Sequence, residues 1–304
     1  MRMPPAEVAI DKDLVRALLA DQHQDLSDFE VGAPVEGWDN TTFRLGQTLA
    51  VRLPRRSTGA EIATTELEWL PRLGREWTFP APVPVRIGEP ACGYPWRWSV
   101  VPWVTGELAY DAPLTDAGAR DLGAALAQVH QPAPDDAPVN PYRSGSLHDV
   151  AEVFDSRLRG LEDAGDISLE HADVLRAVFE SGADTPEPPR TWSHLDVHGA
   201  NVLTRHGRLA GLLDWGDAGA ADPATDLGQA CTLVGTVHAN ALLQAYGTAM
   251  GPMRAGAGSP GRLRVAARAV AFAATLASIG DEPYRSAGLR AMQDWVDTDV
   301  AWAA

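Results

Sequence analysis

The residues best suited to chemistry lie in the stretch SHLDVHGANVLTRHGRLAGLLDWGD, residues 193–217. His194, Asp196 and Asn201 follow the spacing H-x-D-x-x-x-x-N, and Asp214 comes thirteen residues after Asn201. A carboxylate can accept the proton of a hydroxyl group, and amide and carboxylate oxygens are suitable ligands for Mg²⁺. An acid, an amide and a second acid in this order therefore suit the transfer of a phosphoryl group to a hydroxyl.

Two short apolar runs, residues 201–203 and 209–213, connect the amide to the second acid. Arg205-His206-Gly207-Arg208 lies between them and predicts a tight hairpin. Because a hairpin returns its two ends to one side, we expect Asn201 and Asp214 to lie next to each other as ligands of one phosphate-bound Mg²⁺.

The pattern H-x-D-x-x-x-x-N is loose by itself, and a chain of 304 residues could contain it by chance. Asp-Trp-Gly at 214–216 argues against chance, since protein kinases carry Asp-Phe-Gly after the same motif. The segment resembles the aminoglycoside phosphotransferase family of antibiotic kinases, whose pattern is close to HGDLHPGNVL, a hairpin, IDWGDAG, DPA and DLA. Leu195 and Ala200 replace glycines of that pattern, and Gly199 stands where a proline is common.

The resemblance implies a two-lobed, protein-kinase-like α+β fold. Residues 1–103 would form a small antiparallel-sheet lobe that binds the nucleotide, and residues 104–304 a larger, mostly helical lobe for catalysis and substrate binding. A length of 304 residues also exceeds what one core usually supports. In this fold Asp196 would orient the substrate hydroxyl and take its proton, and His194 would brace the loop.

Arg52 is the predicted nucleotide-binding cation of the first lobe. Alternation over residues 29–54 predicts paired strands, and Arg52 lies in the last of them, where a kinase has its phosphate-binding lysine. Lys12 is the sole lysine, so an arginine must take this role. The alternative is an edge-strand arginine that faces water. The resemblance selects Glu66, within the helix predicted over 59–73, as the residue that orients Arg52, while Glu68 faces another way.

Two further segments are predicted to contact the nucleotide. The polar turn at 37–42 contains Asp39, Asn40 and Thr41, where kinases fold a loop over the phosphates, although a plain hairpin turn is the alternative from spacing alone. Strand 96–103 ends the first lobe, and the resemblance implies that Val101 and Trp103 bind the base through main-chain groups.

The second part of the chain is predicted to be helical. Thr115 can cap a helix over 116–130, and Asp226 is expected to fix the backbone of the catalytic loop. Further helices are expected over 148–163, 169–181, 240–250, 263–280 and 285–302, the last three forming a wall of the substrate cleft.

Composition limits the partners. Residues 1–103 carry 11 basic and 14 acidic side chains, and residues 104–304 carry 14 and 27, so the net charge of −16 divides into −3 and −13. This acidity argues against nucleic acid and favours a cationic small molecule, although acidic surfaces often serve only solubility. Two distant cysteines predict neither a disulfide nor a metal site. No segment predicts a signal peptide or a membrane span, so we expect a cytoplasmic protein; the oligomeric state is not predicted.

The sequence therefore predicts a magnesium-dependent kinase that transfers the γ-phosphate of ATP or GTP to a hydroxyl of an antibiotic-like, cationic substrate. An aminoglycoside is the first choice, followed by a macrolide or cyclic-peptide antibiotic. A metabolic kinase of small alcohols or sugars is an alternative. A degenerate kinase fold that only binds nucleotide is another, which intact Asp196, Asn201 and Asp214 argue against.

Overall fold

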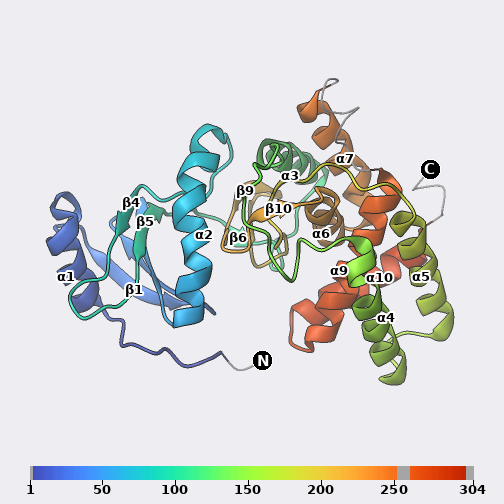
Figure 1. The fold of residues 1–304 in the computed structure, drawn as a ribbon, viewed down its shortest axis with the longest axis horizontal. Coiled ribbons are helices and arrows are strands. Elements are labelled where there is room, and N and C mark those ends of the chain that lie inside the picture. Colours follow the sequence, from blue (N-terminus) through green and yellow to red (C-terminus); the bar gives the residue numbers. More distant parts are fainter. Residues whose placement is uncertain (1–2, 252–260, 299–304) are drawn as a thin grey trace. The chain divides into compact units, whose positions relative to one another are not determined.

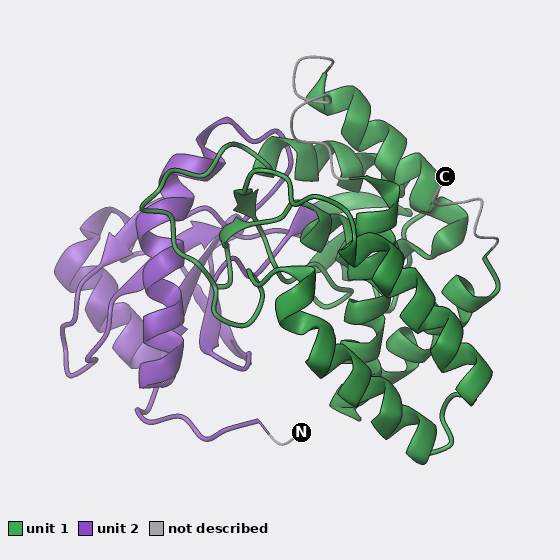
Figure 2. Ribbon diagram, turned by 45° about the vertical axis from the view of Figure 1, so that its right-hand side comes forward, with its two compact units in different colours: residues 1, 106–210, 217–304 green, residues 2–105, 211–216 purple. Residues whose placement is uncertain are grey.

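The computed structural model describes residues 3–251 and 261–298, and its contacts divide the chain into two compact units. Unit 1 comprises residues 1, 106–210 and 217–304, and unit 2 comprises residues 2–105 and 211–216 (Figure 2). Residues 211–216 join unit 2 because they contact its residues directly: the Leu212 N–H donates to the Pro80 carbonyl at 3.1 Å, and the ring of Trp215 lies 4.4 Å from that of Trp77. The sequence order alone does not reveal this exchange.

Unit 2 is built on an antiparallel sheet of order β1-β2-β3-β5-β4 (Figure 1). Its strands are β1 (Val31–Glu36), β2 (Asn40–Leu45), β3 (Leu49–Pro54), β4 (Arg86–Gly88) and β5 (Trp98–Pro102). Its helices are α1 (Lys12–Gln22) and α2 (Ser57–Leu73), with 3-10 turns at Gln24–Leu26 and Gly74–Glu76.

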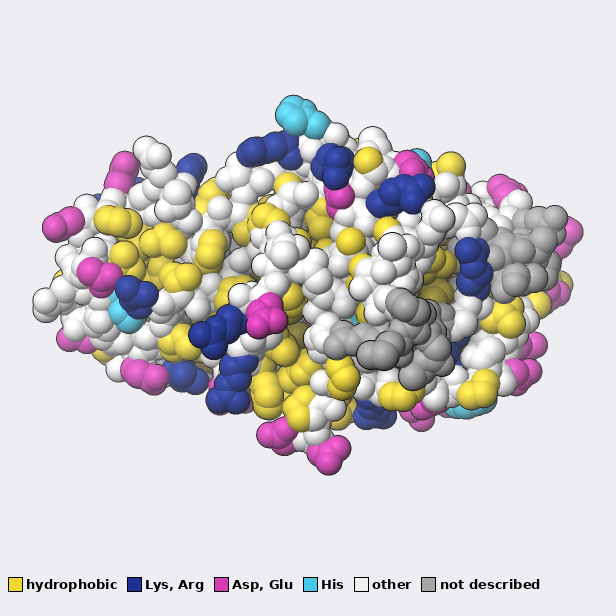
Figure 3. Space-filling view, turned by 90° about the horizontal axis from the view of Figure 1, so that it is seen from above, with side chains coloured by type: hydrophobic (Ala, Val, Ile, Leu, Met, Phe, Trp, Pro, Cys, Tyr) yellow, Lys and Arg dark blue, Asp and Glu magenta, His cyan; other side chains and the backbone are white. Residues whose placement is uncertain are grey.

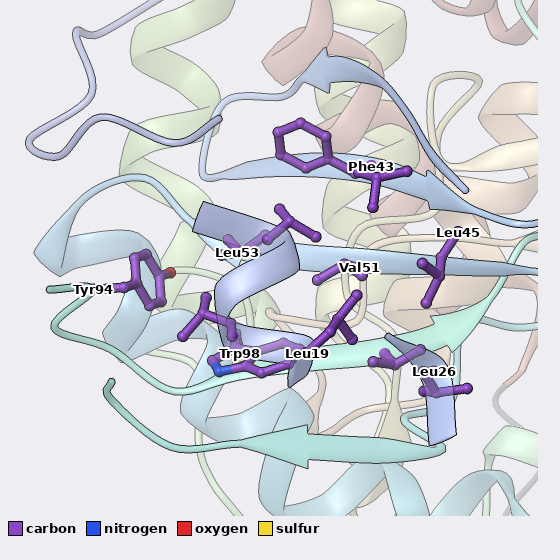
Figure 4. Close-up of a cluster of buried hydrophobic side chains, with 12 residues drawn as sticks. Leu19, Leu26, Phe43, Leu45, Val51, Leu53, Tyr94 and Trp98 are labelled. Atoms are coloured by element: carbon purple, nitrogen blue, oxygen red, sulfur yellow. The ribbon is translucent and has the colours of Figure 1, made fainter. Parts of the chain in front are cut away.

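Alternation along the strands gives this sheet one buried face. Phe43 and Leu45 of β2 are fully buried, whereas Arg44 between them is exposed. Leu19 of α1 packs onto the same face, next to Trp98 of β5 (Figure 4). The core of unit 2 therefore lies between α1 and the sheet, and it holds β3 in place.

Unit 1 is mostly helical. Its helices are α3 (Asp116–Val129), α4 (Leu147–Asp163), α5 (Leu169–Ala183), α6 (Ala224–Val234), α7 (Thr236–Met250), α9 (Arg262–Ile279) and α10 (Tyr284–Val296). Its strands are β6 (Glu107–Leu108), β7 (Thr191–Ser193), β8 (Val202–Arg205), β9 (Arg208–Leu212) and β10 (Gly219–Ala221), and β9 runs on into unit 2.

Helix α9 is the centre of the helical packing and contacts α4, α5, α6 and α10. Its many alanines allow neighbouring helices to approach closely, as at Ala269 and Ala273, which are fully buried. It also buries Arg264, whose Nε donates to Asp222 at 2.5 Å. This buried pair joins α9 to the segment that follows β10.

The predicted combination of a small antiparallel sheet and a larger helical part is confirmed. The cap at Thr115 is present, since its hydroxyl accepts the Gly118 N–H at 3.4 Å. The last predicted helix ends at Val296, and residues 299–302 of that prediction lie outside the described residues. Among the described residues, no helix is long and apolar enough to cross a membrane.

Candidate active site

The loop at 194–201 is fixed by Asp226, which is fully buried in α6. Its carboxylate accepts the backbone N–H groups of His194 at 2.6 Å and Leu195 at 2.7 Å. Burial alone would raise the pKa of Asp226, but His130 and His194 outweigh burial, so the pKa is lowered. The expected structural role of Asp226 is confirmed.

His130 completes this buried network. Its Nε2 lies 3.0 Å from Asp226, and its Nδ1 lies 3.0 Å from the hydroxyl of Tyr246. Because a carboxylate only accepts, Nε2 carries the proton, and Nδ1 of a neutral ring then accepts from the tyrosine hydroxyl. The loop is thus tied to α3, α6 and α7 at once.

Leu195 adopts a left-handed backbone conformation, with φ of 69°. The related pattern has a glycine here, which takes this conformation without strain. Three bonds hold the leucine in it: its N–H donates to Asp226, and its carbonyl accepts from Gln229 at 2.9 Å and from Arg143 at 3.0 Å. These bonds stabilise the left-handed conformation at a residue that is not glycine.

Asp196 has hydrogen-bond donors on both carboxylate oxygens. Arg143 donates to Oδ1, and Asn201 Nδ2 donates to Oδ2 at 3.0 Å. His198 Nε2 also lies 3.3 Å from Oδ2. Burial would raise the pKa of Asp196, but His198, Arg143 and His194 outweigh burial and hold the pKa well below its usual range. The carboxylate is ionised near neutral pH.

His198 is oriented by its other nitrogen. The Ala200 N–H donates to Nδ1 at 3.2 Å, so the proton of the neutral ring sits on Nε2, which faces Asp196. The ring is stacked on Tyr110 at 6.2 Å and meets Tyr284 edge-on at 5.4 Å. His194 is fully buried, and its Nδ1 accepts the Asp196 N–H at 3.2 Å, consistent with a bracing role.

Asn201 retains an oxygen that fits a hard cation. Among the described residues, Asn201 Nδ2 donates to the Asp196 carbonyl and carboxylate, each at 3.0 Å, and it also lies 3.3 Å from His198 Nε2. These contacts all use the amide nitrogen, which leaves Oδ1 as an acceptor. Asp214 has a side chain 55 % exposed, with a carboxylate that can also accept a cation. Each side chain therefore carries an oxygen of the kind that Mg²⁺ binds.

Unit 2 contains Arg52 and Glu66, the pair predicted to bind the nucleotide. Arg52 of β3 donates to Glu66 of α2 and lies 3.9 Å from Asp214. The Glu66 side chain is buried, and that of Arg52 is 12% exposed. Burial opposes the charge of Arg52, but Glu66 and Asp214 outweigh it and raise the Arg52 pKa. The water-facing alternative for Arg52 is wrong. Glu68 is exposed, as predicted.

Asp214 is presented by an anchored turn. Its backbone is left-handed, with φ of 58°, and Trp215 after it is buried. The Trp215 ring lies 4.4 Å from that of Trp77 and 6.3 Å from that of Phe79. Its indole N–H donates to the Leu212 carbonyl at 3.2 Å. Aromatic packing therefore fixes the backbone from which Asp214 projects.

The remaining predicted nucleotide contacts lie in unit 2. Asp39 accepts from Arg56 at 2.8 Å, Asn40 begins β2, and Thr41 is buried. Val101 is buried in β5, and the Trp103 N–H donates to the Thr48 carbonyl at 2.8 Å. Trp103 can thus offer a base its carbonyl or ring, with its N–H already bonded. The nucleotide-binding roles of these residues stay predictions.

A pocket of about 360 Å³ lies within unit 1, next to the catalytic loop. Its wall contains His198 and Gly199 of that loop, together with apolar side chains such as Phe272 of α9. Asp294 of α10 is the acidic residue of this wall. This volume is that of a small-molecule site.

The sequence model of the phosphotransferase enzyme family matches residues 31–267, most of the chain. The chain belongs to this family. As a family member it is a phosphotransferase that acts on hydroxyl groups, so the predicted family and enzyme class are confirmed. No curated protein matches the sequence.

Solved structures share the fold of this family member. The GDP complex of wild-type aminoglycoside 2'-phosphotransferase-IIIa is 18% identical, with a TM-score of 0.62 over 94% of this chain and 99% of that chain. Macrolide 2'-phosphotransferase MphH from Brachybacterium faecium is 22% identical, with a TM-score of 0.56 over 92% and 97%. ADP-bound aminoglycoside phosphotransferase APH(2'')-Ib is 19% identical, with a TM-score of 0.56 over 96% and 99%.

Three side chains of the site in this phosphotransferase were not predicted: Arg143 and Asn140, which lie between α3 and α4, and Tyr110 after β6. Their segments lack periodicity, and their contacts span more than fifty residues. One signal was available: with Lys12 as the sole lysine, a cation beside Asp196 has to be arginine or histidine.

Replacement of Asp226 by asparagine tests the anchor of the loop. Asp226→Asn should lower the free energy of unfolding at pH 7 by roughly 3 kcal/mol, because the carboxylate accepts hydrogen bonds on both oxygens and an amide has only one acceptor oxygen, so at least one buried backbone N–H loses its partner. Urea denaturation measures this difference. Glu152→Gln, at an exposed position of α4, should change it little.

The same comparison has a pH dependence. The folded-state pKa of Asp226 lies below its ordinary value of 3.8, so its stabilisation is complete above that value and is lost as pH falls through the lowered pKa. The difference between wild type and Asp226→Asn should shrink in acid. A difference that grows as pH falls would contradict this assignment.

Arg52 and Glu66 should be energetically coupled in nucleotide binding. A double-mutant cycle with Arg52→Met and Glu66→Gln should give an interaction free energy of about 1 kcal/mol or more. Either single change already breaks the ion pair, so the double variant should lose less than the sum of the two single losses. Titration calorimetry with Mg-ATP and Mg-GTP measures it, and Glu68→Gln in place of Glu66→Gln is the matched control. Simple additivity of the two changes would remove Glu66 from the nucleotide site.

Proposed function

We propose that this phosphotransferase transfers the γ-phosphate of ATP or GTP to a hydroxyl of a small, antibiotic-like molecule that carries positive charge. The observation that carries the proposal is the Asp196 carboxylate, ionised and held from both oxygens by Arg143, Asn201 and His198. An oriented carboxylate beside a free amide oxygen suits in-line transfer to an alcohol.

In the proposed reaction, Asp196 accepts a hydrogen bond from the substrate hydroxyl and aligns its oxygen. The bond from the γ-phosphorus to the bridging oxygen breaks, a bond to the substrate oxygen forms, and the hydroxyl proton passes to Asp196. A carboxylate with a lowered pKa is a weak base, so the proton moves late, as a loose transition state allows.

We assign binding of the nucleotide phosphates to residues of both units. Asn201 and Asp214 would hold Mg²⁺, which when bound neutralises charge on the β and γ phosphates. Arg52, oriented by Glu66, would contact the same phosphates with its guanidinium group. The turn containing Asp39, Asn40 and Thr41 and the β5 residues Val101 and Trp103 would contact the remainder of the nucleotide.

Several structural neighbours are complexes with GDP, ADP or ATP, and two of these complexes also contain kanamycin or streptomycin. They support a nucleotide co-substrate and a hydroxyl-bearing antibiotic as the acceptor class. The alternative of a metabolic kinase for small alcohols or sugars shares the same catalytic residues. The alternative of a degenerate nucleotide-binding module does not explain the oriented carboxylate at Asp196.

The side chains of the pocket wall narrow the class of acceptor that we propose. Asp294 offers one carboxylate, Arg290 on the same helix offers one positive charge, and Phe272, Leu276 and Val237 offer apolar surface. One ammonium group on a largely apolar body matches this wall better than a polyamine does. We therefore place a macrolide-like acceptor ahead of an aminoglycoside, reversing the order that net charge alone suggests.

The division of roles between the two acids is testable. Asp196→Ala and Asp214→Ala should each lower turnover by roughly 10³-fold or more, because each removes a group used in the transition state. Asp214→Ala should also weaken Mg-nucleotide binding, whereas Asp196→Ala should leave it nearly intact. Equal binding losses in calorimetry would contradict the assignment.

An acceptor panel tests the proposed function and the charge of the substrate. Coupled kinase assays with macrolides, aminoglycosides and neutral sugars should show turnover with a KM that rises with salt, since salt screens a charge pair. Asp294→Asn should raise the KM for a monoamine acceptor roughly fivefold, and Asp297→Asn, one turn further on, should not. Phosphorylation of neutral alcohols alone, without a salt effect, would contradict the cationic acceptor.

A further inference from the structure

Arg143 contacts the catalytic carboxylate from outside every sequence motif of the site. It lies between α3 and α4, and its Nη1 donates to the Asp196 carboxylate and to the Leu195 carbonyl, the latter at 3.0 Å. Its Nε lies 3.1 Å from Asp217. One guanidinium group therefore joins the catalytic loop to the segment that leads into β10.

The surroundings of Arg143 are organised to present it. Asn140 Nδ2 donates to Asp217 at 2.8 Å, and Asn140 Oδ1 accepts the backbone N–H groups of Tyr142 and Arg143. Ser144 closes the turn, because its hydroxyl accepts the Asn140 N–H at 3.0 Å. The turn and Asp217 are bonded to each other as well as to Arg143. These bonds fix the position of the Arg143 backbone and the direction of its guanidinium group.

The charges of this cluster bear directly on phosphoryl transfer. Asp196 and Asp217 are two carboxylates close to where an anionic γ-phosphate must arrive in the proposed reaction, and like charges repel. Arg143 contacts both and reduces their combined charge. The catalytic loop has His198 and no lysine near Asp196, so Arg143 is the permanent positive charge on Asp196 among the described residues.

We propose that Arg143 is a positioning residue for phosphoryl transfer, which orients the Asp196 carboxylate toward the substrate hydroxyl and offsets its charge as the γ-phosphoryl group approaches. The proposal rests on the proposed function. Asn201 and His198 hold Oδ2, and Arg143 holds Oδ1, so loss of Arg143 frees the carboxylate to rotate about Cβ–Cγ. The γ-phosphoryl group comes closest to the Asp196 carboxylate in the transition state. Loss of Arg143 should therefore lower kcat more than it changes KM.

The competing explanation is that Arg143 only holds its turn together. Arg176 provides the matched control, because it also pairs with carboxylates, Asp155, Glu162 and Asp173, at a similar exposure. Its side chain is 25% exposed and that of Arg143 is 33% exposed, but Arg176 joins α4 to α5 and touches no residue of the site.

The experiment compares Arg143→Met, Arg143→Lys, Arg143→Ala and Arg176→Met in the full chain. Arg143→Met should lower kcat about 100-fold, in the range for loss of one preorganised donor, with KM values for nucleotide and acceptor within about threefold of wild type. Arg143→Lys keeps the positive charge but lacks the planar guanidinium group, so its kcat should lie between those of wild type and Arg143→Met. Guanidinium ion at millimolar concentration should restore part of kcat in Arg143→Ala, and Arg176→Met should keep wild-type kcat.

Unchanged kcat in Arg143→Met would overturn the proposal. A loss of kcat that is equally large in Arg176→Met, that follows the loss of thermal stability in both variants and that guanidinium does not rescue in Arg143→Ala would overturn it as well. Failure of the wild type to phosphorylate any alcohol would instead count against the proposed function. In that case nucleotide hydrolysis by water gives the same kcat comparison. Crystals of Arg143→Met should show the Asp196 carboxylate turned from its wild-type orientation, and an unmoved carboxylate would also contradict the proposal.

Discussion

The candidate site depends on one buried carboxylate that holds the backbone of the loop at 194–201. Asp226 is buried in α6 and accepts two consecutive backbone N–H groups, those of His194 and Leu195. A buried charge is tolerated only where hydrogen bonds replace water, and here the replacement comes from the loop itself and from His130. Because these bonds fix the residues just before Asp196, the fold itself positions the carboxylate that we propose as catalytic.

Two arginines then pair with four acids of the candidate site. Arg52 is shared by Glu66 and Asp214 in unit 2, and Arg143 is shared by Asp196 and Asp217 in unit 1. Each guanidinium group presents several donors in a fixed plane, so one arginine can orient two carboxylates, which an ammonium group does less well. A chain with lysine only at position 12 thus meets both needs with arginine.

Local patterns predicted many of the helices and strands. The strands around Arg52, the hairpin of β8 and β9 and the cap at Thr115 follow from alternation, turn residues and capping, which act over a few positions. The contact of Arg143 with Asp196 spans 53 residues and arises from an aperiodic segment, so no local pattern encodes it. The assignment of 211–216 to unit 2 was missed for the same reason, since aromatic packing on Trp77 decides it.

Net charge counts acids that lie far from a site together with those that line it. Many acids of residues 104–304 pair with arginine away from the pocket, as Asp121 does with Arg208 and Asp155 with Arg176. On the face shown in Figure 3, acidic and basic side chains are both present, and the acidic ones are scattered and do not form one patch. A bound molecule responds to the charges within a Debye length, roughly 8 Å in physiological salt. Our proposal for the acceptor therefore rests on the carboxylate of Asp294 in the pocket wall more than on the balance of −13.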